Sequence, residues 1–422
     1  MTSHLLTVVR SLCFSRDRTA ELETFSDADW EALLPLCDRS HLTLPLGVRA
    51  IHRLPAWVRE RIKRNLADNA MRHTRADTAY REIAAAFAAR GVEYVVLKGF
   101  SQYPHYCSNL RYRPQYDLDI YCPPGAIQGA LECVTGLGYT FFRRANSPMD
   151  HLPPLIRKTG WRPGTDYFDP EMPLTVELHF RFWDPETERF HPRPGEAFWA
   201  RRISERYGSL EFPALSPDDR FSYAAWHLIR HLVRGDLRAY HVYEIAHFLD
   251  ATATNDEWWS GWSRSRPSGV EALAFLLARE WFDCRLHPLA DRLVELLPSP
   301  VHRWFEDFSF SPLTAWEHPN KDELFLHLSL VHGFRDRIHV LRRRLIPIRF
   351  QPPVLDAHVP SPSRGLRWKR GIFGVWFMAK RSIFHLRALF PVLRSAIRWH
   401  RALVRQPSRR LPRKLPSENA AR

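Results

Sequence analysis

The fold is decided by the stretch VEYVVLKGFSQYPHYCSNLRYRPQYDLDI, residues 92–120, in which an irregular segment joins two apolar runs. The first run predicts a strand that ends in Lys98-Gly99, with the start of a short helix at Phe100-Ser101. A helix start after a glycine leaves free backbone N–H groups where a phosphate can bind, and the missing Cβ lets the phosphate come close. Lys98, Gly99 and Ser101 are therefore candidate phosphate-binding residues.

The second run, DLDIY, places two carboxylates on one predicted strand. Because alternate side chains on a strand share a face, Asp117 and Asp119 project together, while Leu118 and Ile120 turn toward the core. Two carboxylates this close repel each other and need a compensating charge. Mg²⁺ or Mn²⁺ provides one through oxygen ligands, usually with substrate phosphates completing the shell. A pair of solvated surface carboxylates is the structural alternative.

A third acidic residue lies in a later extended run, residues 174–183, which follows a turn-rich connection. In this run Glu177 and His179 alternate with apolar residues, so both side chains face one way. They would face the same cleft as Asp117 if the two strands are neighbours. The alternative is an exposed edge strand with polar side chains.

Three motifs resemble those of the uncharacterised nucleotidyltransferases of the DNA polymerase β superfamily: VLKGFS at 96–101, RPQYDLD at 113–119 and VELH at 176–179. The similarity extends over roughly residues 25–255. It implies a small mixed sheet, a divalent-metal site, and ATP or another nucleoside triphosphate as donor. By this resemblance Asp117, Asp119 and Glu177 are the metal-binding and catalytic carboxylates, and Arg113 joins the phosphate-binding residues.

The predicted reaction moves a nucleoside monophosphate to an acceptor hydroxyl or phosphate and expels pyrophosphate. Metal ions and positioning would supply most of the rate, because phosphoryl chemistry needs little covalent help. Two alternatives use the same site: a phosphotransferase that moves the γ-phosphate, and a non-catalytic, membrane-associated scaffold that binds nucleotide. The acceptor and the nucleotide base are not fixed by the sequence.

The predicted fold class is α+β, with four regions along the chain. These are an N-terminal helical segment that packs on the core (1–90), a nucleotidyltransferase core with a small mixed sheet (91–215), a helical domain (216–350) and a basic, aromatic, partly disordered tail (351–422). A long helix from about Trp57 to Arg90 leads into the first strand. Further strands are expected at 139–142, near 167–168 and in 174–183, with a proline-rich boundary at 189–217.

Two predicted helices of the third region carry polar residues that point to the site. His227 and His231 are four residues apart and share a helix face, and Glu244 lies on the next helix. Zinc binding is one interpretation of this histidine pair, although the glutamate of the metalloprotease motif is absent. The other is packing beside the nucleotide site, where His179, His227, His231 and Glu244 would support the metal-binding carboxylates.

Charge is distributed unevenly along the 422 residues, whose net charge is +15. Residues 331–422 hold 22 Lys and Arg against three acids, a net charge of +19, which leaves −4 for the rest of the chain. The predicted catalytic body is therefore not a basic surface for nucleic acid. Six scattered cysteines without a C-x-x-C pair and an N-terminus unlike a signal peptide favour reduced thiols and a cytoplasmic protein.

The segment from Leu366 to Phe390 alternates aromatic and aliphatic residues with Lys and Arg. Its longest uncharged run, 371–379, is far below the ~20 apolar residues needed to span a bilayer. This composition favours a segment that lies on an anionic membrane, as a peripheral protein on the inner face would have. A docking helix for a protein partner and an arm that binds single-stranded RNA are the alternatives. Residues 401–422 are expected to be disordered.

Overall fold

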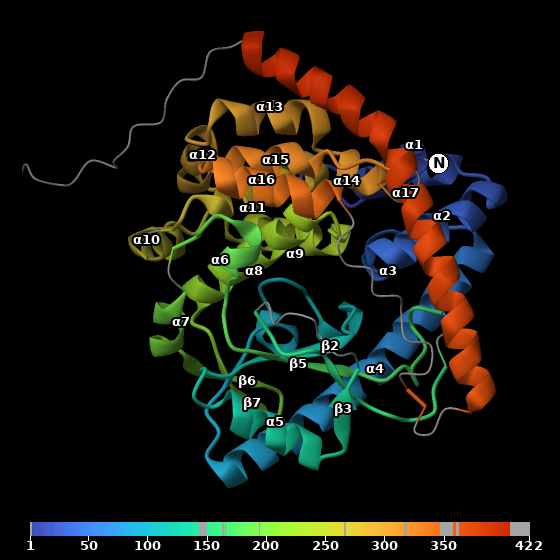
Figure 1. The fold of residues 1–422 in the computed structure, drawn as a ribbon, viewed down its shortest axis with the longest axis vertical. Coiled ribbons are helices and arrows are strands. Elements are labelled where there is room, and N and C mark those ends of the chain that lie inside the picture. Colours follow the sequence, from blue (N-terminus) through green and yellow to red (C-terminus); the bar gives the residue numbers. More distant parts are fainter. Residues whose placement is uncertain are drawn as a thin grey trace, which may run out of the picture.

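Figure 1 shows the computed structural model of the chain, which describes residues 2–142, 150–162, 164, 166–193, 195–265, 267–315, 319–346, 358–359 and 363–405. The N-terminal region is helical: α1 (Thr2–Ser11), η1 (Thr19–Thr24), α2 (Asp27–Ser40), α3 (Thr43–Ala50), η2 (Ile51–Arg53) and α4 (Ala56–Arg90). The central region holds the strands: β1 (Val95–Val96), η3 (Gly99–Gln102), η4 (Leu110–Tyr112), β2 (Asp117–Tyr121), α5 (Ile127–Gly136), β3 (Tyr139–Phe141), β4 (Leu155–Arg157), β5 (Thr175–His179), α6 (Pro185–Glu188), α7 (Glu196–Ala200), β6 (Ile203–Tyr207) and β7 (Leu210–Ala214). The remainder is helical: α8 (Pro217–Arg234), α9 (Ala239–Thr252), α10 (Asp256–Arg264), α11 (Val270–Phe282), α12 (Pro288–Glu295), α13 (Ser299–Phe308), α14 (Ser311–Thr314), α15 (Glu323–Leu330), α16 (Phe334–Leu345) and α17 (Arg364–Arg405). The predicted α+β class is confirmed.

The long helix α4 forms where the sequence predicts it. Its apolar residues Ala76, Tyr80, Ile83 and Phe87 recur at helical spacing and are all buried. Gly91 ends the helix in the left-handed conformation, with φ 64°, and its N–H donates to the carbonyls of the last turn. Glycine adopts this conformation without the strain a Cβ would add. The helix thus delivers the chain directly to β1.

The strands form one mixed seven-stranded sheet in the described residues, in the order β3-β4-β5-β2-β1-β7-β6. β2 pairs with β5 in parallel and with β1 in antiparallel orientation. The DLDIY strand (β2) and the VELH strand (β5) are therefore adjacent, and both lie inside the sheet. This rules out the interpretation of β5 as an edge strand. The predicted small mixed sheet is confirmed.

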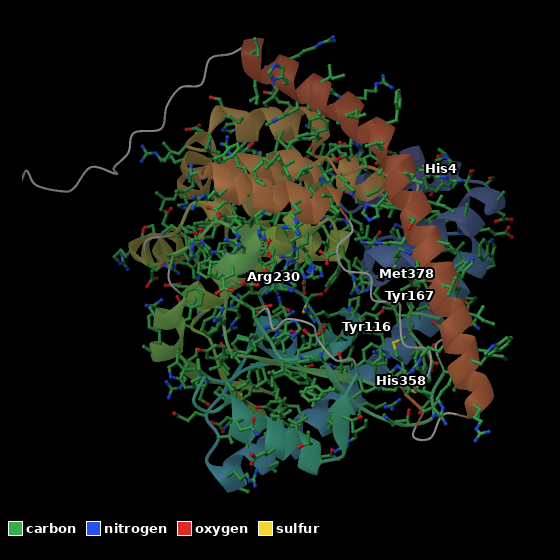
Figure 2. All side chains as sticks on the ribbon, in the orientation of Figure 1. His4, Tyr116, Tyr167, Arg230, His358 and Met378 are labelled. Atoms are coloured by element: carbon green, nitrogen blue, oxygen red, sulfur yellow. The ribbon has the colours of Figure 1, made fainter. Side chains whose placement is uncertain are left out.

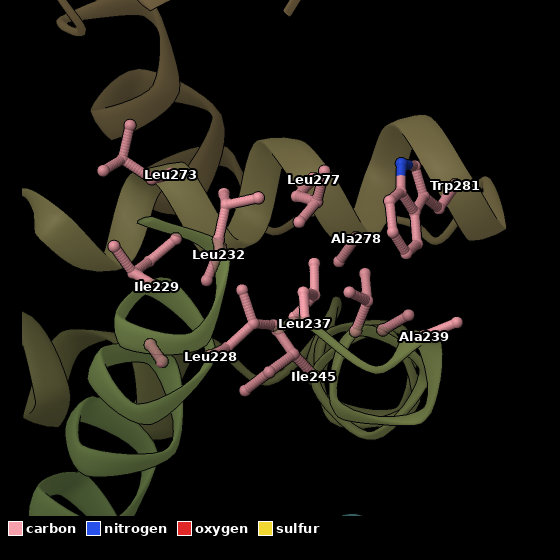
Figure 3. Close-up of a cluster of buried hydrophobic side chains, with 14 of the residues drawn as sticks. Leu228, Ile229, Leu232, Leu237, Ala239, Ile245, Leu273, Leu277, Ala278 and Trp281 are labelled. Carbon is pink, nitrogen blue, oxygen red and sulfur yellow. The ribbon is translucent and has the colours of Figure 1, made fainter. Parts of the chain in front are cut away.

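The two faces of the sheet are covered by different helices. The apolar residues of β2 and β5, such as Leu118 and Val176, belong to the core cluster that also contains the buried stripe of α4 and residues of α5. A second and larger cluster lies among the C-terminal helices, where α8, α9 and α11 bury leucine, isoleucine and tryptophan side chains against one another (Figure 3). The polar residues of β2 and β5 lie between these layers, on the sheet face that α8 and α9 cover (Figure 1).

Several sequence predictions are wrong in detail. Residues 167–168 form a turn and not a strand, while β4 occurs where none was predicted. The segment 189–217 is not a bare boundary, because it contains α7 and the β6-β7 hairpin, and β7 pairs with β1.

The C-terminal region forms a single long helix in the described residues, α17, which runs along the outside of the molecule (Figure 1). Residues 401–405, expected to be disordered, belong to this helix. The rest of that expectation, residues 406–422, and residues 351–357 and 360–362 of the predicted tail lie outside the described residues. No helix in the described part of the chain is both long and apolar enough to cross a bilayer.

Candidate active site

The site is built on two neighbouring strands whose register aligns their polar residues. In the parallel pair β2-β5, Asp119 lies opposite Glu177, and Tyr121 lies opposite His179. Side chains opposite each other on adjacent strands are close enough to interact. The predicted meeting of the D-x-D strand with the E-x-H strand is thus what the sheet provides.

Asp119 is the most tightly held member of the group, with a side chain only 1% exposed. Its Oδ2 lies 2.9 Å from Lys98 Nζ, and its Oδ1 lies 3.1 Å from His179 Nε2. Burial by itself would raise the pKa of the Asp119 carboxyl, but Lys98 and His179 outweigh that effect and hold the pKa well below its usual range. Asp119 is therefore a fixed negative charge at the centre of the site.

The other two carboxylates are electrostatically strained. Burial, followed by the charge of Asp119, raises the pKa of Asp117 above its ordinary value. The same two causes, with Asp117 third, raise the pKa of Glu177 to about 7. Such repulsion among carboxylates is relieved by a cation placed between them. Glu177 keeps 22% of its side chain exposed, so a substrate can reach it, and Asp117 is likewise only partly buried.

One set of side chains in the described residues converges well enough to hold a metal ion: Asp119, Glu177 and His179, each with a ligand atom within 4.8 Å of the others. Two carboxylate oxygens suit Mg²⁺ or Mn²⁺, and the imidazole nitrogen suits Mn²⁺ and other transition metals better than Mg²⁺. The donor set therefore fits a divalent cation. It differs from the predicted set, because His179 is in it and Asp117 is not.

The backbone at Gly99 gives glycine a role besides the predicted close approach of a phosphate. Gly99 has φ 70°, a conformation that glycine adopts without the strain a Cβ would add, and a Cβ there would lie 2.6 Å from the end of the Gln115 side chain, which would have to move. Its N–H is directed at Gln102 Oε1, 3.4 Å away. Ser101 is completely buried, and its hydroxyl has no partner in the part of the chain that the structure describes. In this conformation Lys98, with 14% of its side chain exposed, is the accessible member of the loop.

Arg113 and Glu244 form a buried ion pair. Arg113 Nε donates to Glu244 Oε1 at 2.6 Å, and both side chains are buried. Burial lowers the pKa of Arg113, but Glu244 more than reverses this and raises it above its ordinary value. A buried pair of this kind ties the segment between η4 and β2 to α9, because losing either partner would leave the other charge unpaired.

The histidines of α8 lie beside Lys98. His227 Nε2 is 3.0 Å from Lys98 Nζ, and His231 Nε2 is 3.1 Å from His227 Nε2. His241 of α9 stacks on His227, with ring centroids 4.9 Å apart and planes 14° apart. Burial and then Lys98 lower the pKa of His227 well below its ordinary value, so this ring is neutral. His231 meets the His227 ring edge-on, with the planes 66° apart. In the described residues these histidines are not part of a group whose ligand atoms could hold a metal ion, so the packing interpretation is favoured over zinc.

Sequence reasoning missed Asp150 and Arg230, which form the layer behind His179. Asp150 Oδ2 lies 3.7 Å from His179 Nδ1, and the same carboxylate accepts from Arg230. Figure 2 places Arg230 between the sheet and the C-terminal helices. A carboxylate behind a ligating histidine orients the ring and raises its basicity. No spacing in the sequence indicates this contact, since Asp150 and Arg230 are far apart in the chain.

The family model described as "Uncharacterised nucleotidyltransferase" matches residues 26–283 of the chain. The chain therefore belongs to this family, and the resemblance read from the three motifs is confirmed. The matched range contains every residue of the site described above, whereas α17 lies outside it. Comparisons with curated proteins and with solved structures give no match. Membership supports nucleotidyl transfer as the general activity, with a nucleoside triphosphate as substrate.

Proposed function

We propose that the chain is a divalent-metal-dependent nucleotidyltransferase that moves a nucleoside monophosphate from ATP to an acceptor hydroxyl or phosphate. One observation carries this proposal: the β2-β5 register brings Asp119, Glu177 and His179 within 4.8 Å of one another, next to Lys98. A metal ion held there, Mg²⁺ or Mn²⁺, would supply positive charge to the triphosphate and lower the pKa of the acceptor group.

The residues have separable roles in this proposal. Asp119 and His179 hold the metal side of the site, and Asp117, on the same face of β2, adds negative charge to it. Lys98 contacts Asp119 and is partly exposed, so it neutralises phosphate charge at the leaving group. Glu177 is the more exposed carboxylate and faces the acceptor. The Gly99 loop positions Lys98, while the buried Ser101 and the Arg113-Glu244 pair support the loop and the segment before β2.

The location that fits this activity is a reducing compartment supplied with ATP, and we propose the cytoplasm. All six cysteines are free and buried. Burial raises the pKa of several of these thiols, Cys107 and Cys122 among them to about 12, so they stay protonated and unreactive.

The test follows the phosphates of ATP. The protein is incubated with ATP labelled either at the α- or at the γ-phosphate, with an extract of the host as the source of acceptor. We expect α-label to enter an acid-stable product and γ-label to appear in pyrophosphate, with both lost on adding EDTA and regained with Mg²⁺ or Mn²⁺. Release of ADP with γ-label in the product would instead identify a phosphotransferase.

Two variants complete the design. Asp119→Asn removes the central charge, and Asp291→Asn, an exposed ion-paired carboxylate on α12, is the matched control. Nucleotide binding measured by calorimetry without any labelled product, and unchanged by Asp119→Asn, would contradict the proposal in favour of a non-catalytic scaffold.

A further inference from the structure

The outer face of α17 is apolar along its whole length. The core helices bury large apolar side chains, but eleven such side chains on α17 are between 49% and 74% exposed. They are Trp368, Ile372, Val375, Trp376, Ile383, Leu386, Leu389, Phe390, Leu393, Ile397 and Val404. Successive members are one, three, four or seven residues apart, steps that keep them on one side of a helix of 3.6 residues per turn. Trp368 and Val404, at the two ends, are separated by about ten turns of 3.6 residues and so lie on the same side of the helix. Exposed apolar stripes of this extent mark interaction surfaces.

The opposite face of α17 is the one that holds the helix to the body. Ala388, Val392 and Trp399 are buried, and the Trp399 ring lies 6.0 Å from that of Phe325 on α15. Arg398 also pairs with Asp307 of α13 at 2.5 Å. The apolar stripe therefore faces away from the protein, in agreement with the position of α17 along the outside of the molecule in Figure 1.

The charge on the same helix has one sign. α17 contains eleven Lys and Arg and no Asp or Glu. Beside α13, a groove combines both properties, because apolar and basic side chains line it together: Arg303, Asp307, Phe390, Leu393, Arg394, Ile397, Arg398 and Arg401. Four guanidinium groups against one carboxylate, next to three apolar side chains, match a phosphate headgroup joined to an acyl chain.

We propose that this face of α17 is a docking surface for an anionic lipid membrane, on which the helix lies flat. The stripe also contains a seven-residue repeat, at Trp376, Ile383, Phe390, Ile397 and Val404, so its spacing alone would suit a second helical copy as well. A second copy of α17 would place eleven basic residues beside eleven others with no acidic residue between them, and these like charges repel. An anionic lipid surface offers the opposite charge. The stripe is also mainly aliphatic, whereas single-stranded RNA is held by stacking on aromatic rings.

The experiment measures sedimentation of the full-length protein with vesicles of phosphatidylcholine, either alone or mixed with phosphatidylglycerol. We expect binding to the mixed vesicles, with a weaker partition coefficient for phosphatidylcholine alone, and release as salt is raised to about 0.5 M, where charges are screened. The double variant Leu386→Gln/Phe390→Gln should lower the partition coefficient at least about tenfold, because two apolar side chains no longer enter the lipid.

The matched control makes the same two substitutions on other exposed positions, Leu296→Gln and Phe334→Gln, which lie outside α17. It should bind vesicles like the wild type, and both double variants should keep the wild-type melting temperature. Equal binding by all three proteins would overturn the proposal. So would a dimer by ultracentrifugation that Leu386→Gln/Phe390→Gln dissolves without any vesicle binding, or tight binding of an RNA oligonucleotide by a protein that ignores lipid.

Discussion

Around Asp119 and along α17 the protein concentrates charge in two different environments. At the site, three carboxylates, Lys98 and His179 are confined between the sheet and α8, and most of their polar atoms lie within about 4 Å of another charged group. Along α17, the basic side chains are exposed to solvent, and a partner is attracted by their combined charge. Water screens the second arrangement far more than the first. One substitution should therefore be decisive at the site and minor on α17.

The largest expected effect separates the two aspartates of β2. Asp119→Asn and Asp117→Asn should each lower turnover, by about a thousandfold for Asp119, because the charge facing the metal is lost. Their stabilities should differ. Asp119 has a lowered pKa and pairs with Lys98, so Asp119→Asn should cost about 3 kcal/mol of unfolding free energy in the metal-free protein. Asp117 has a raised pKa, so Asp117→Asn should leave the unfolding free energy unchanged.

These values come from urea unfolding and from initial rates at saturating metal and nucleotide. If the two variants lose the same unfolding free energy, the assignment of Asp119 as the central charge is wrong.

The next effect concerns Glu177, which is the partly exposed carboxylate of the metal-binding group. Glu177→Gln keeps the shape of the side chain and removes its charge, and it should lower kcat about a hundredfold while nucleotide affinity changes about twofold at most. The reason is that Glu177 faces the acceptor and Lys98 faces the phosphates. Single-turnover rates and calorimetry with ATP measure the two quantities. A loss confined to nucleotide affinity would move Glu177 to the donor side.

A smaller effect is expected from the neutral His227, which lies beside Lys98. The folded pKa of His227 is depressed, so below pH 6.5 the unfolded chain binds a proton there that the folded protein does not bind. Its contribution to stability is thus lost as the pH falls, by up to about 1.4 kcal/mol between pH 6.5 and 5.5. Other buried histidines add to this dependence of the unfolding free energy on pH.

Substitution isolates the contribution of this one ring. His227→Gln should lower the number of protons taken up on unfolding between pH 6.5 and 5.5 by about one, so the unfolding free energy should fall less steeply with falling pH. Replacement of the exposed His400 should leave this pH dependence unchanged. Urea unfolding at several pH values measures the slope. An unchanged slope in His227→Gln would mean that the ring is protonated in the folded protein.

The smallest effect is expected on α17. Lys380→Ala removes one of eleven charges and should lower partition into anionic vesicles about fivefold, since one basic residue near such a surface contributes about 1 kcal/mol. Turnover and the melting temperature should not change. A loss as large as that of the double apolar variant would show a specific site at Lys380 in place of a distributed surface.

Much of the fold was predictable where local patterns are strong. The long helix ending at Arg90 and the strand at 117–121 both occur as predicted, because each depends on neighbouring residues alone. The β6-β7 hairpin was missed, since its strands lie in a segment broken by prolines and are stabilised by pairing of β7 with β1. Strand propensity depends on such neighbours more than on the segment itself.

The sequence by itself determined that Asp117 and Asp119 share one strand face and that Glu177 and His179 share another, because the alternation of side chains along a strand is a local property. Only the tertiary structure decided that His179 joins Asp119 and Glu177, that Asp150 and Arg230 lie behind it, and that Arg113 pairs with Glu244. It also decided which face of α17 is exposed. The physical reason is the same in each case: contacts between distant segments are fixed by sheet register and helix packing, which no local pattern encodes.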